Sequence, residues 1–167
     1  MHSCLCYCRE RMKAPMIKFA KATCEDAQQL TEVQIKTFDD DARKFFDKPI
    51  GGPSGYDSVK WQLDMMQSGI YYKILDKDMI IGGMVISRLK PGQYKLRRLY
   101  VDPDYQDKGV GTKAISFMEN EFPDAQTWNL DTPVVATRNH HFYEKLGYMR
   151  TGDDGDGQYL YEKRITQ

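Results

Sequence analysis

Apolar residues recur along the chain with two different spacings, and the shorter spacing predicts β-strands. In several stretches apolar and polar residues alternate, or short runs are rich in Ile, Val and Tyr, as is typical of strands. The predicted strands cover residues 17–23, 70–75, 79–89, 94–101, 127–131, 148–151 and 159–163. The turn Asp76-Lys77-Asp78 joins the second and third of these as a hairpin, so three consecutive strands are expected to form a meander.

Four other stretches repeat apolar residues every three or four positions and predict helices. The first helix is expected after Thr23, with Asp26 completing a capping box. The second is expected after Asp57 or Ser58 and ends at Gly69. The last two are predicted over residues 109–122 and 138–146, the latter capped by Thr137. Helices and strands in this order indicate an α/β fold with a sheet of mixed direction.

Size and charge limit the classes of function. A chain of 167 residues and 19.4 kDa suits one domain with its own core. The 24 basic and 24 acidic residues cancel, so no broad field would attract nucleic acid or an anionic membrane. The longest apolar run, 79–86, is too short to span a bilayer. We therefore expect neither a nucleic-acid partner nor a membrane partner.

Three of the four cysteines lie near the amino terminus, at Cys4, Cys6 and Cys8. Their spacing differs from the C-x₂₋₄-C of a zinc site, so no metal is expected. The surrounding sequence has no long apolar stretch of the kind that a signal peptide needs, which favours a cytoplasmic location. Residues 1–15 are expected to be a flexible tail and residues 16–167 the domain.

The segment 106–112 carries the strongest indication of chemistry. It reads Gln106-Asp107-Lys108-Gly109-Val110-Gly111-Thr112 and lies between a predicted strand and a predicted helix. Its two glycines let the backbone turn without side chains in the way, and the helix start adds free N–H groups and a positive dipole end. The segment therefore predicts a diphosphate cradle, with Lys108 and Lys113 adding charge, although a tight turn without a ligand has the same pattern.

One candidate ligand of this cradle is a dinucleotide. Gly109, Gly111 and Ala114 fit G-x-G-x-x-[GA], and Asp131 follows at about 20 residues. Seven residues separate Val101 from Gly109, however, whereas that motif follows its strand almost directly. The preceding strands also form a meander rather than a βαβ unit, which weighs against a dinucleotide-dependent oxidoreductase.

A second candidate rests on two longer motifs. Residues 99–111, Leu-Tyr-Val-Asp-Pro-Asp-Tyr-Gln-Asp-Lys-Gly-Val-Gly, resemble the acetyl-CoA-binding segment of the GNAT N-acetyltransferase superfamily, L-x-V-x-P-x-x-[QR]-x-x-G-x-[GA]. Residues 142–148, Phe-Tyr-Glu-Lys-Leu-Gly-Tyr, resemble that family's F-Y-E-K-L-G-F ending, about thirty residues later. The order and spacing of the two motifs agree with the family.

The resemblance implies a fold and a coenzyme site. It implies one mixed sheet of about six to seven strands with helices on both faces, splayed between the fourth and fifth strands. Acetyl-CoA would lie in this gap, with its pantetheine on the strand ending at Val101 and its pyrophosphate on the glycine segment. The implied cofactor-binding residues are Leu99, Tyr100, Val101, Gln106, Asp107, Lys108, Gly109, Val110, Gly111, Thr112, Asn139 and Tyr143.

The resemblance also implies catalytic roles. The backbone N–H of Val101 would stabilise the oxyanion, and Tyr143 would protonate the departing thiolate. The glutamate that many relatives carry before L-x-V is absent here, so the base is open. Asp131 is the first candidate, with His140 or a chain of waters as alternatives.

The first two predicted helices and their loop are expected to form the acceptor wall. Acidic residues beside aromatic ones suit an amine with an apolar body, although aspartates on a solvent face and aromatics in the core give the same pattern. The residues are Asp39, Asp40, Asp41, Phe45, Phe46, Tyr56 and Trp61. The sequence thus predicts an acyltransferase that moves an acetyl group to a primary amine by direct attack in a ternary complex. An acyl-CoA sensor without catalysis is the non-enzymatic alternative. The acceptor is expected to be a small-molecule or peptide amine, and the sequence leaves its identity open. It also leaves open whether the protein is a homodimer.

Overall fold

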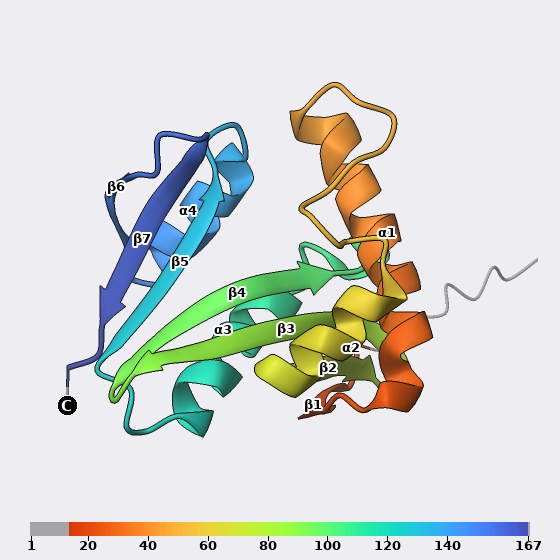
Figure 1. Ribbon diagram of the computed structural model, residues 1–167, viewed down its shortest axis with the longest axis horizontal. Coiled ribbons are helices and arrows are strands. Elements are labelled where there is room, and N and C mark those ends of the chain that lie inside the picture. The colour runs from red at the N-terminus through yellow and green to blue at the C-terminus, as the bar shows by residue number, and fades with distance from the viewer. Residues whose placement is uncertain (1–13, 167) are drawn as a thin grey trace, which may run out of the picture.

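The computed structural model describes residues 14–166, which form one mixed sheet flanked by helices (Figure 1). The strands are β1 (Ile17–Lys21), β2 (Ile70–Asp76), β3 (Met79–Lys90), β4 (Gln93–Val101), β5 (Thr127–Pro133), β6 (Met149–Asp153) and β7 (Gln158–Arg164). The helices are α1 (Ala27–Phe45), α2 (Val59–Ser68), α3 (Val110–Glu121) and α4 (Thr137–Lys145), with short 3₁₀ turns at Cys24–Asp26 and Pro103–Tyr105. The predicted order of elements and the α/β class are confirmed.

The strands lie in the order β1-β2-β3-β4-β5-β7-β6, and the β4–β5 contact is parallel whereas the others are antiparallel. The parallel contact is short, because β4 pairs with β5 only at Gln93, Tyr94 and Lys95. Beyond Lys95 the two strands diverge, as Figure 1 shows between the green and cyan arrows. The expected splay between the fourth and fifth strands is therefore present.

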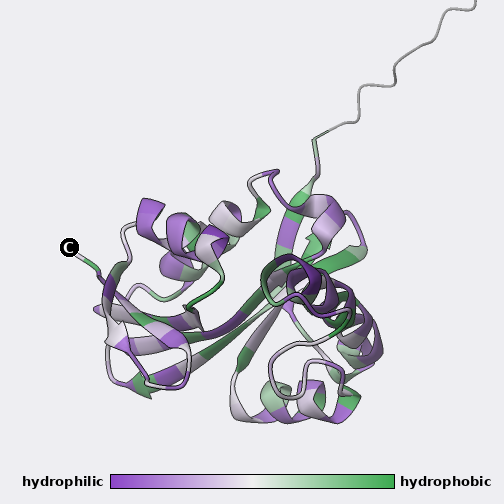
Figure 2. Cartoon of the chain, turned by 90° about the horizontal axis from the view of Figure 1, so that it is seen from above, coloured by the Kyte–Doolittle hydropathy of each residue, from purple (hydrophilic) through white to green (hydrophobic). Residues whose placement is uncertain are grey.

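Each face of the sheet carries its own hydrophobic core. Helices α1 and α2 cover one face, where Leu30 and Val33 pack with Val85 and Tyr100. Helices α3 and α4 cover the other, in a larger core that includes Trp128. Figure 2 shows the helices on opposite sides of the sheet, with hydrophilic residues along their ribbons. This two-sided cover holds β4 in place and leaves the end that carries Val101 beside the gap.

The ends of several elements differ from the prediction. Ala136, not Thr137, is the residue before α4, and Thr137 is the first helical residue. The Thr23–Asp26 capping box is present, but it opens a 3₁₀ turn that leads into α1 at Ala27. Such shifts arise because a helix boundary depends on backbone hydrogen bonds as well as on apolar spacing.

The sequence predicts a flexible amino-terminal tail whose three cysteines bind no metal. Cys4, Cys6, Cys8 and nearly all of the expected tail lie outside the residues that the structure describes.

Within residues 14–166, no helix is long and apolar enough to cross a membrane. The same part of the chain contains no group of three or more His, Cys, Asp or Glu side chains that could hold a metal ion.

Candidate active site

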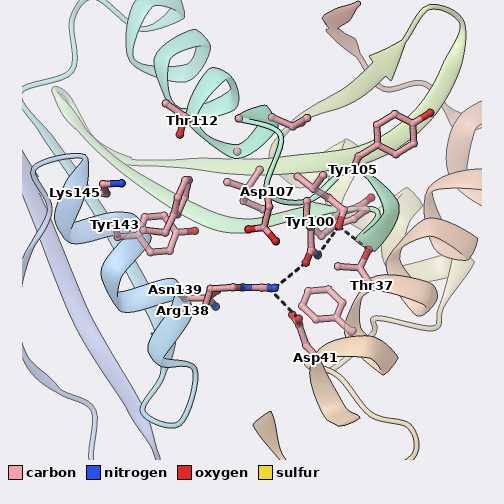
Figure 3. A pocket seen from close by; sticks show the side chains of 18 residues that line it. Thr37, Asp41, Tyr100, Tyr105, Asp107, Thr112, Arg138, Asn139, Tyr143 and Lys145 are labelled. Atoms are coloured by element: carbon pink, nitrogen blue, oxygen red, sulfur yellow. Dashed lines mark hydrogen bonds and ion pairs between the residues drawn. The ribbon is translucent and has the colours of Figure 1, made fainter. Parts of the chain in front are cut away.

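A cavity of about 470 Å³ lies where β4 and β5 diverge (Figure 3). Its lining comes from α1, the end of β4, the following loop, the start of α3, and α4: Thr37, Phe38, Asp41, Leu99, Tyr100, Val101, Tyr105, Gln106, Asp107, Gly109, Val110, Gly111, Thr112, Arg138, Asn139, Phe142, Tyr143 and Lys145. Every predicted cofactor-binding residue except Lys108 belongs to this lining. Three segments distant in sequence are thus brought together around one space.

The backbone at the end of β4 faces this space. Asp102 N–H donates to the carbonyl of Ile81 at 2.7 Å, and Val101 is opposite Gly82 in the antiparallel register. Because hydrogen-bonded and non-hydrogen-bonded pairs alternate along antiparallel strands, the N–H and C=O of Val101 point away from β3, toward the splay. The Val101 carbonyl accepts hydrogen bonds there from Gln106 Nε2 at 2.9 Å and Thr37 Oγ1 at 3.3 Å.

The loop after β4 turns sharply into α3. Asp107 and Gly109 both have left-handed backbone conformations, with φ of 59° and 77°. Gly109 precedes α3, and its carbonyl accepts the first helical hydrogen bond, from Lys113 N–H at 3.1 Å. The N–H groups of the first turn therefore have no partner within the helix, which leaves a positive dipole end beside the cavity.

The two glycines of the segment have different roles. A Cβ on Gly109 would meet nothing within 4 Å, so this residue is required for its backbone angle and borders open space. Gly111 lies inside α3 with ordinary helical geometry, contrary to the expectation that both glycines serve the turn. A Cβ on Gly111 would come within 3.0 Å of the Phe142 ring, so this glycine allows α4 to approach α3.

Asn139 and Tyr143 extend from α4 into the cavity lining (Figure 3). Asn139 Nδ2 donates to Thr132 Oγ1 at 3.2 Å, which fixes the amide against β5. Burial raises the pKa of the Tyr143 hydroxyl above its usual value near 10, because an ionised phenolate would be poorly solvated there. The hydroxyl therefore stays protonated at neutral pH and can act as a hydrogen-bond donor.

The two candidate bases of the sequence analysis do not line the cavity. The Asp131 carboxylate forms an ion pair with Lys95 Nζ at 2.9 Å, across the β4–β5 contact. His140 Nε2 lies 2.9 Å from the Pro133 carbonyl oxygen, and its ring packs against Tyr159 with centroids 5.1 Å apart. Neither placement brings these groups to the space beside Val101 and Tyr143.

The expected acceptor wall is reduced to one carboxylate. Of the three consecutive aspartates, only Asp41 is part of the lining. Asp39 accepts hydrogen bonds from Gly51 N–H and from the Tyr56 hydroxyl, both at 3.0 Å, and so organises the loop after α1. Asp40 pairs with Lys44 on the same helix. Trp61 is also engaged elsewhere, since the Arg98 guanidinium lies over its ring at 3.9 Å.

A residue that the sequence analysis did not single out spans the cavity. Arg138 Nη2 lies 3.2 Å from Asp41 Oδ1, and Arg138 Nη1 donates to Gln106 Oε1 at 2.7 Å. Figure 3 marks this chain of contacts, which continues from Gln106 to the Val101 carbonyl. Burial raises the pKa of Asp41, although the nearby Arg138 partly opposes the shift.

The lining fits an elongated ligand with a pyrophosphate and an acyl-thioester end. The N–H groups at the start of α3, which have no partner within the helix, suit phosphate oxygens, and the open space beside Gly109 lets a phosphate approach the backbone. The outward-facing polar groups at the end of β4 suit an amide-bearing chain, since such a chain can pair with them as a strand would. The expected acetyl-CoA is a molecule of this kind.

Comparison with protein families and curated proteins gives a consistent result. A family model described as an acetyltransferase (GNAT) domain matches residues 67–150. Two Bacillus subtilis proteins, the uncharacterized protein YrkN and the uncharacterized N-acetyltransferase YesJ, are 32% and 33% identical over 47% and 42% of this chain. The matches span less than half of those relatives, 44% and 41% of their lengths. The S-(2-succino)cysteine N-acetyltransferase of B. subtilis is 25% identical over 84% of this chain and 89% of its own.

Solved structures show the same fold. The PaiA N-acetyltransferase from Thermoplasma acidophilum, in complex with coenzyme A, superimposes with a TM-score of 0.77 at 18% identity, over 89% of this chain and 99% of that chain. The ribosomal-protein-S18-alanine N-acetyltransferase from Escherichia coli gives a TM-score of 0.71 at 15% identity, over 91% and 96%.

Proposed function

The chain belongs to the GNAT acetyltransferase family, and we propose that it is an acetyl-CoA-dependent N-acetyltransferase acting on a primary amine. One observation carries this proposal: a single cavity joins the polar backbone at the end of β4, the N-terminus of α3 and the Tyr143 hydroxyl. These are the groups needed to hold a thioester, a pyrophosphate and a leaving thiolate.

The chain's backbone has two tasks in this proposal. Acetyl-CoA supplies a thioester carbonyl that an amine can attack and a thiol that can leave. The Val101 N–H donates to the carbonyl oxygen, where negative charge grows during attack. The first turn of α3 and the loop at residues 106–109 hold the pyrophosphate, with Lys108 beside them. Both sites use fixed backbone dipoles, which need no reorganisation during the reaction.

Two protons must also move. The amine attacks as a neutral base, so its ammonium form first loses one proton, and the nitrogen loses a second as the C–N bond forms and the C–S bond breaks. Tyr143 lines the same cavity and gives its proton to the departing sulfur, and the second proton from the nitrogen restores the hydroxyl by way of solvent. For the amine, Asp41 is the carboxylate that α1 contributes to the lining, and its raised pKa suits it to accept a proton. Asp131 stays a weaker candidate, because it pairs with Lys95 away from the cavity lining.

Release of CoA thiol with a panel of amines tests this function. We expect acetyl-CoA to bind and thiol to appear only with an amine present, together with the N-acetylated product by mass spectrometry. The panel includes amino acids, because a relative that aligns along most of this chain is named for S-(2-succino)cysteine. Binding of acetyl-CoA with no turnover on any amine would favour a sensor. Binding of NADH in place of acetyl-CoA would contradict the proposal.

A further inference from the structure

Arg138 is held over the cavity by three contacts, two from α1 and one from the loop between β4 and α3. Its guanidinium meets the Asp41 carboxylate of α1 at 3.2 Å and the Gln106 amide of the β4–α3 loop at 2.7 Å. The Phe45 ring lies 5.3 Å from its central carbon, against one face. A planar cation fixed on two edges and one face has a defined orientation rather than a mobile surface position.

This anchoring leaves part of the guanidinium unused. Of the five N–H donors of an arginine, the hydrogen bonds to Asp41 and Gln106 use two, and residues 14–166 provide no partner for the others. The Arg138 side chain is 37% exposed, whereas the Asp41 side chain is 18% exposed. The ion pair also leaves Asp41 Oδ2 without a hydrogen-bond partner in the described part of the chain. Unused donors and an unused acceptor thus lie next to each other.

The pair lies at the reactive end of the cavity. Gln106 links the guanidinium to the Val101 carbonyl, because its amide donates to that oxygen at 2.9 Å. Lys145, the other basic residue of the lining, lies at the opposite end of α4 (Figure 3). Arg138 is therefore next to the strand end assigned to the acetyl group, and Lys145 is not.

We propose that Arg138 and Asp41 form the acceptor subsite and that the acceptor carries a carboxylate beside its amine, as a free amino acid does. The remaining N–H donors of the guanidinium receive the carboxylate, an anion that arginine binds through charge-assisted hydrogen bonds. The free Asp41 oxygen receives the ammonium, so adjacent opposite charges of the ligand meet adjacent opposite charges of the protein. This inference rests on the proposed acetyltransferase function and names its substrate class.

Matched pairs of acceptors provide the test. Each pair is an amino acid and its decarboxylated amine: alanine with ethylamine, phenylalanine with 2-phenylethylamine, and S-carboxymethylcysteine with S-carboxymethylcysteamine. The measurements are kcat/KM from CoA thiol release and, independently, calorimetric binding of each acceptor to the enzyme–CoA complex. We expect the wild type to prefer the amino acid in at least one pair, in both measurements.

Three variants locate the preference. In Arg138→Gln the ratio of amino acid to amine should fall about 10- to 100-fold, as expected for lost hydrogen bonds to a charged group. Arg138→Lys keeps the positive charge but lacks the planar guanidinium. Its ratio of amino acid to amine should lie between the ratios of Arg138→Gln and the wild type. Lys145→Gln, the matched control, removes another positive charge of the same lining and should keep the wild-type ratio.

Each failure has a distinct meaning. If CoA does not bind to the wild type, the proposed function itself is wrong. If CoA binds and amines are acetylated without preference for a carboxylate in any pair, the acceptor class is wrong while the function stands. If Arg138→Gln keeps the preference, the guanidinium only ties α4 to α1 and the β4–α3 loop. If Arg138→Gln weakens CoA binding instead, the guanidinium contacts the coenzyme. Either result overturns the inference.

Discussion

The hydroxyl of Tyr143 is the single group on which the proposed proton delivery depends. Tyr143→Phe should lower kcat by about 10²–10⁴, the usual range for loss of a general acid. The Michaelis constants should change little, since the ring and the backbone contacts remain. Burial raises the pKa of Tyr143 above its usual value near 10. Ionisation of Tyr143 should therefore cause no loss of wild-type rate at any pH up to about 10.

A neighbouring phenol provides the control for this variant. The Tyr148 ring lies 5.7 Å from that of Tyr143, but its hydroxyl faces Glu119 at 3.4 Å and it is not part of the lining. Tyr148→Phe should leave kcat close to that of the wild type. Wild-type kcat in Tyr143→Phe would instead assign proton delivery to water or to another residue.

Asp41 should give the protein a recognisable dependence of stability on pH. Burial raises the pKa of Asp41 in the folded state; Asp40 adds to the shift, and Arg138 and Lys44 oppose it. Between the unfolded value of about 3.9 and the folded value, the folded state binds more protons, so the contribution of Asp41 to stability grows as pH falls. Asp41→Asn lacks this contribution. The melting temperature of the wild type minus that of the variant should therefore rise from pH 7 toward pH 4. A difference that does not change with pH would contradict the raised pKa of Asp41.

At the scale of elements, the glycines of β3 allow β4 to carry a large buried side chain. A Cβ on Gly83 would lie 2.6 Å from Tyr100 Cζ, so the tyrosine ring occupies the place of the missing side chain. The Tyr100 hydroxyl meets that of Tyr71, which donates to Gln62 of α2, both at 2.5 Å. This close packing ties α2 and β2 to the strand that ends at the cavity.

Gly83→Ala should lower the free energy of unfolding by about 1–3 kcal/mol, the range typical of overpacking a core. Gly152→Ala in β6 is the matched control, since a Cβ there meets nothing within 4 Å and the residue has no positive φ. The control should be neutral or stabilising by about 0.4–1 kcal/mol. Denaturant unfolding measures the free energy of unfolding of both variants. Equal values would show that Tyr100 moves aside with no loss of stability.

The order of elements was predictable because apolar spacing and turn residues are local properties of the chain. The loop at residues 106–109 was predictable for the same reason, since Gly109 takes a left-handed conformation that glycine favours. The Arg138–Asp41 pair was not, because it joins residues 97 positions apart on different helices. Of three consecutive aspartates, however, one at most could face the cavity, since neighbouring residues on a helix point about 100° apart. That argument would have reduced the expected acceptor wall in advance.

At the scale of the whole molecule, the two cores hold opposite faces of one sheet, and the sheet opens between β4 and β5. The loss of pairing after Lys95 leaves the polar backbone of β4 without a neighbouring strand, beside the cavity. A ligand that completes this gap should stabilise the fold, because it binds the folded state and not the unfolded chain.

The most direct test of the acetyltransferase account is the melting temperature with and without acetyl-CoA. At about 100 times its dissociation constant, acetyl-CoA should stabilise the protein by about 2.7 kcal/mol. For a domain of this size, this corresponds to an increase of about 5–10 °C. NADH at the same concentration should produce no increase. A shift with NADH and none with acetyl-CoA would contradict the central claim that the splay between β4 and β5 is an acetyl-CoA site.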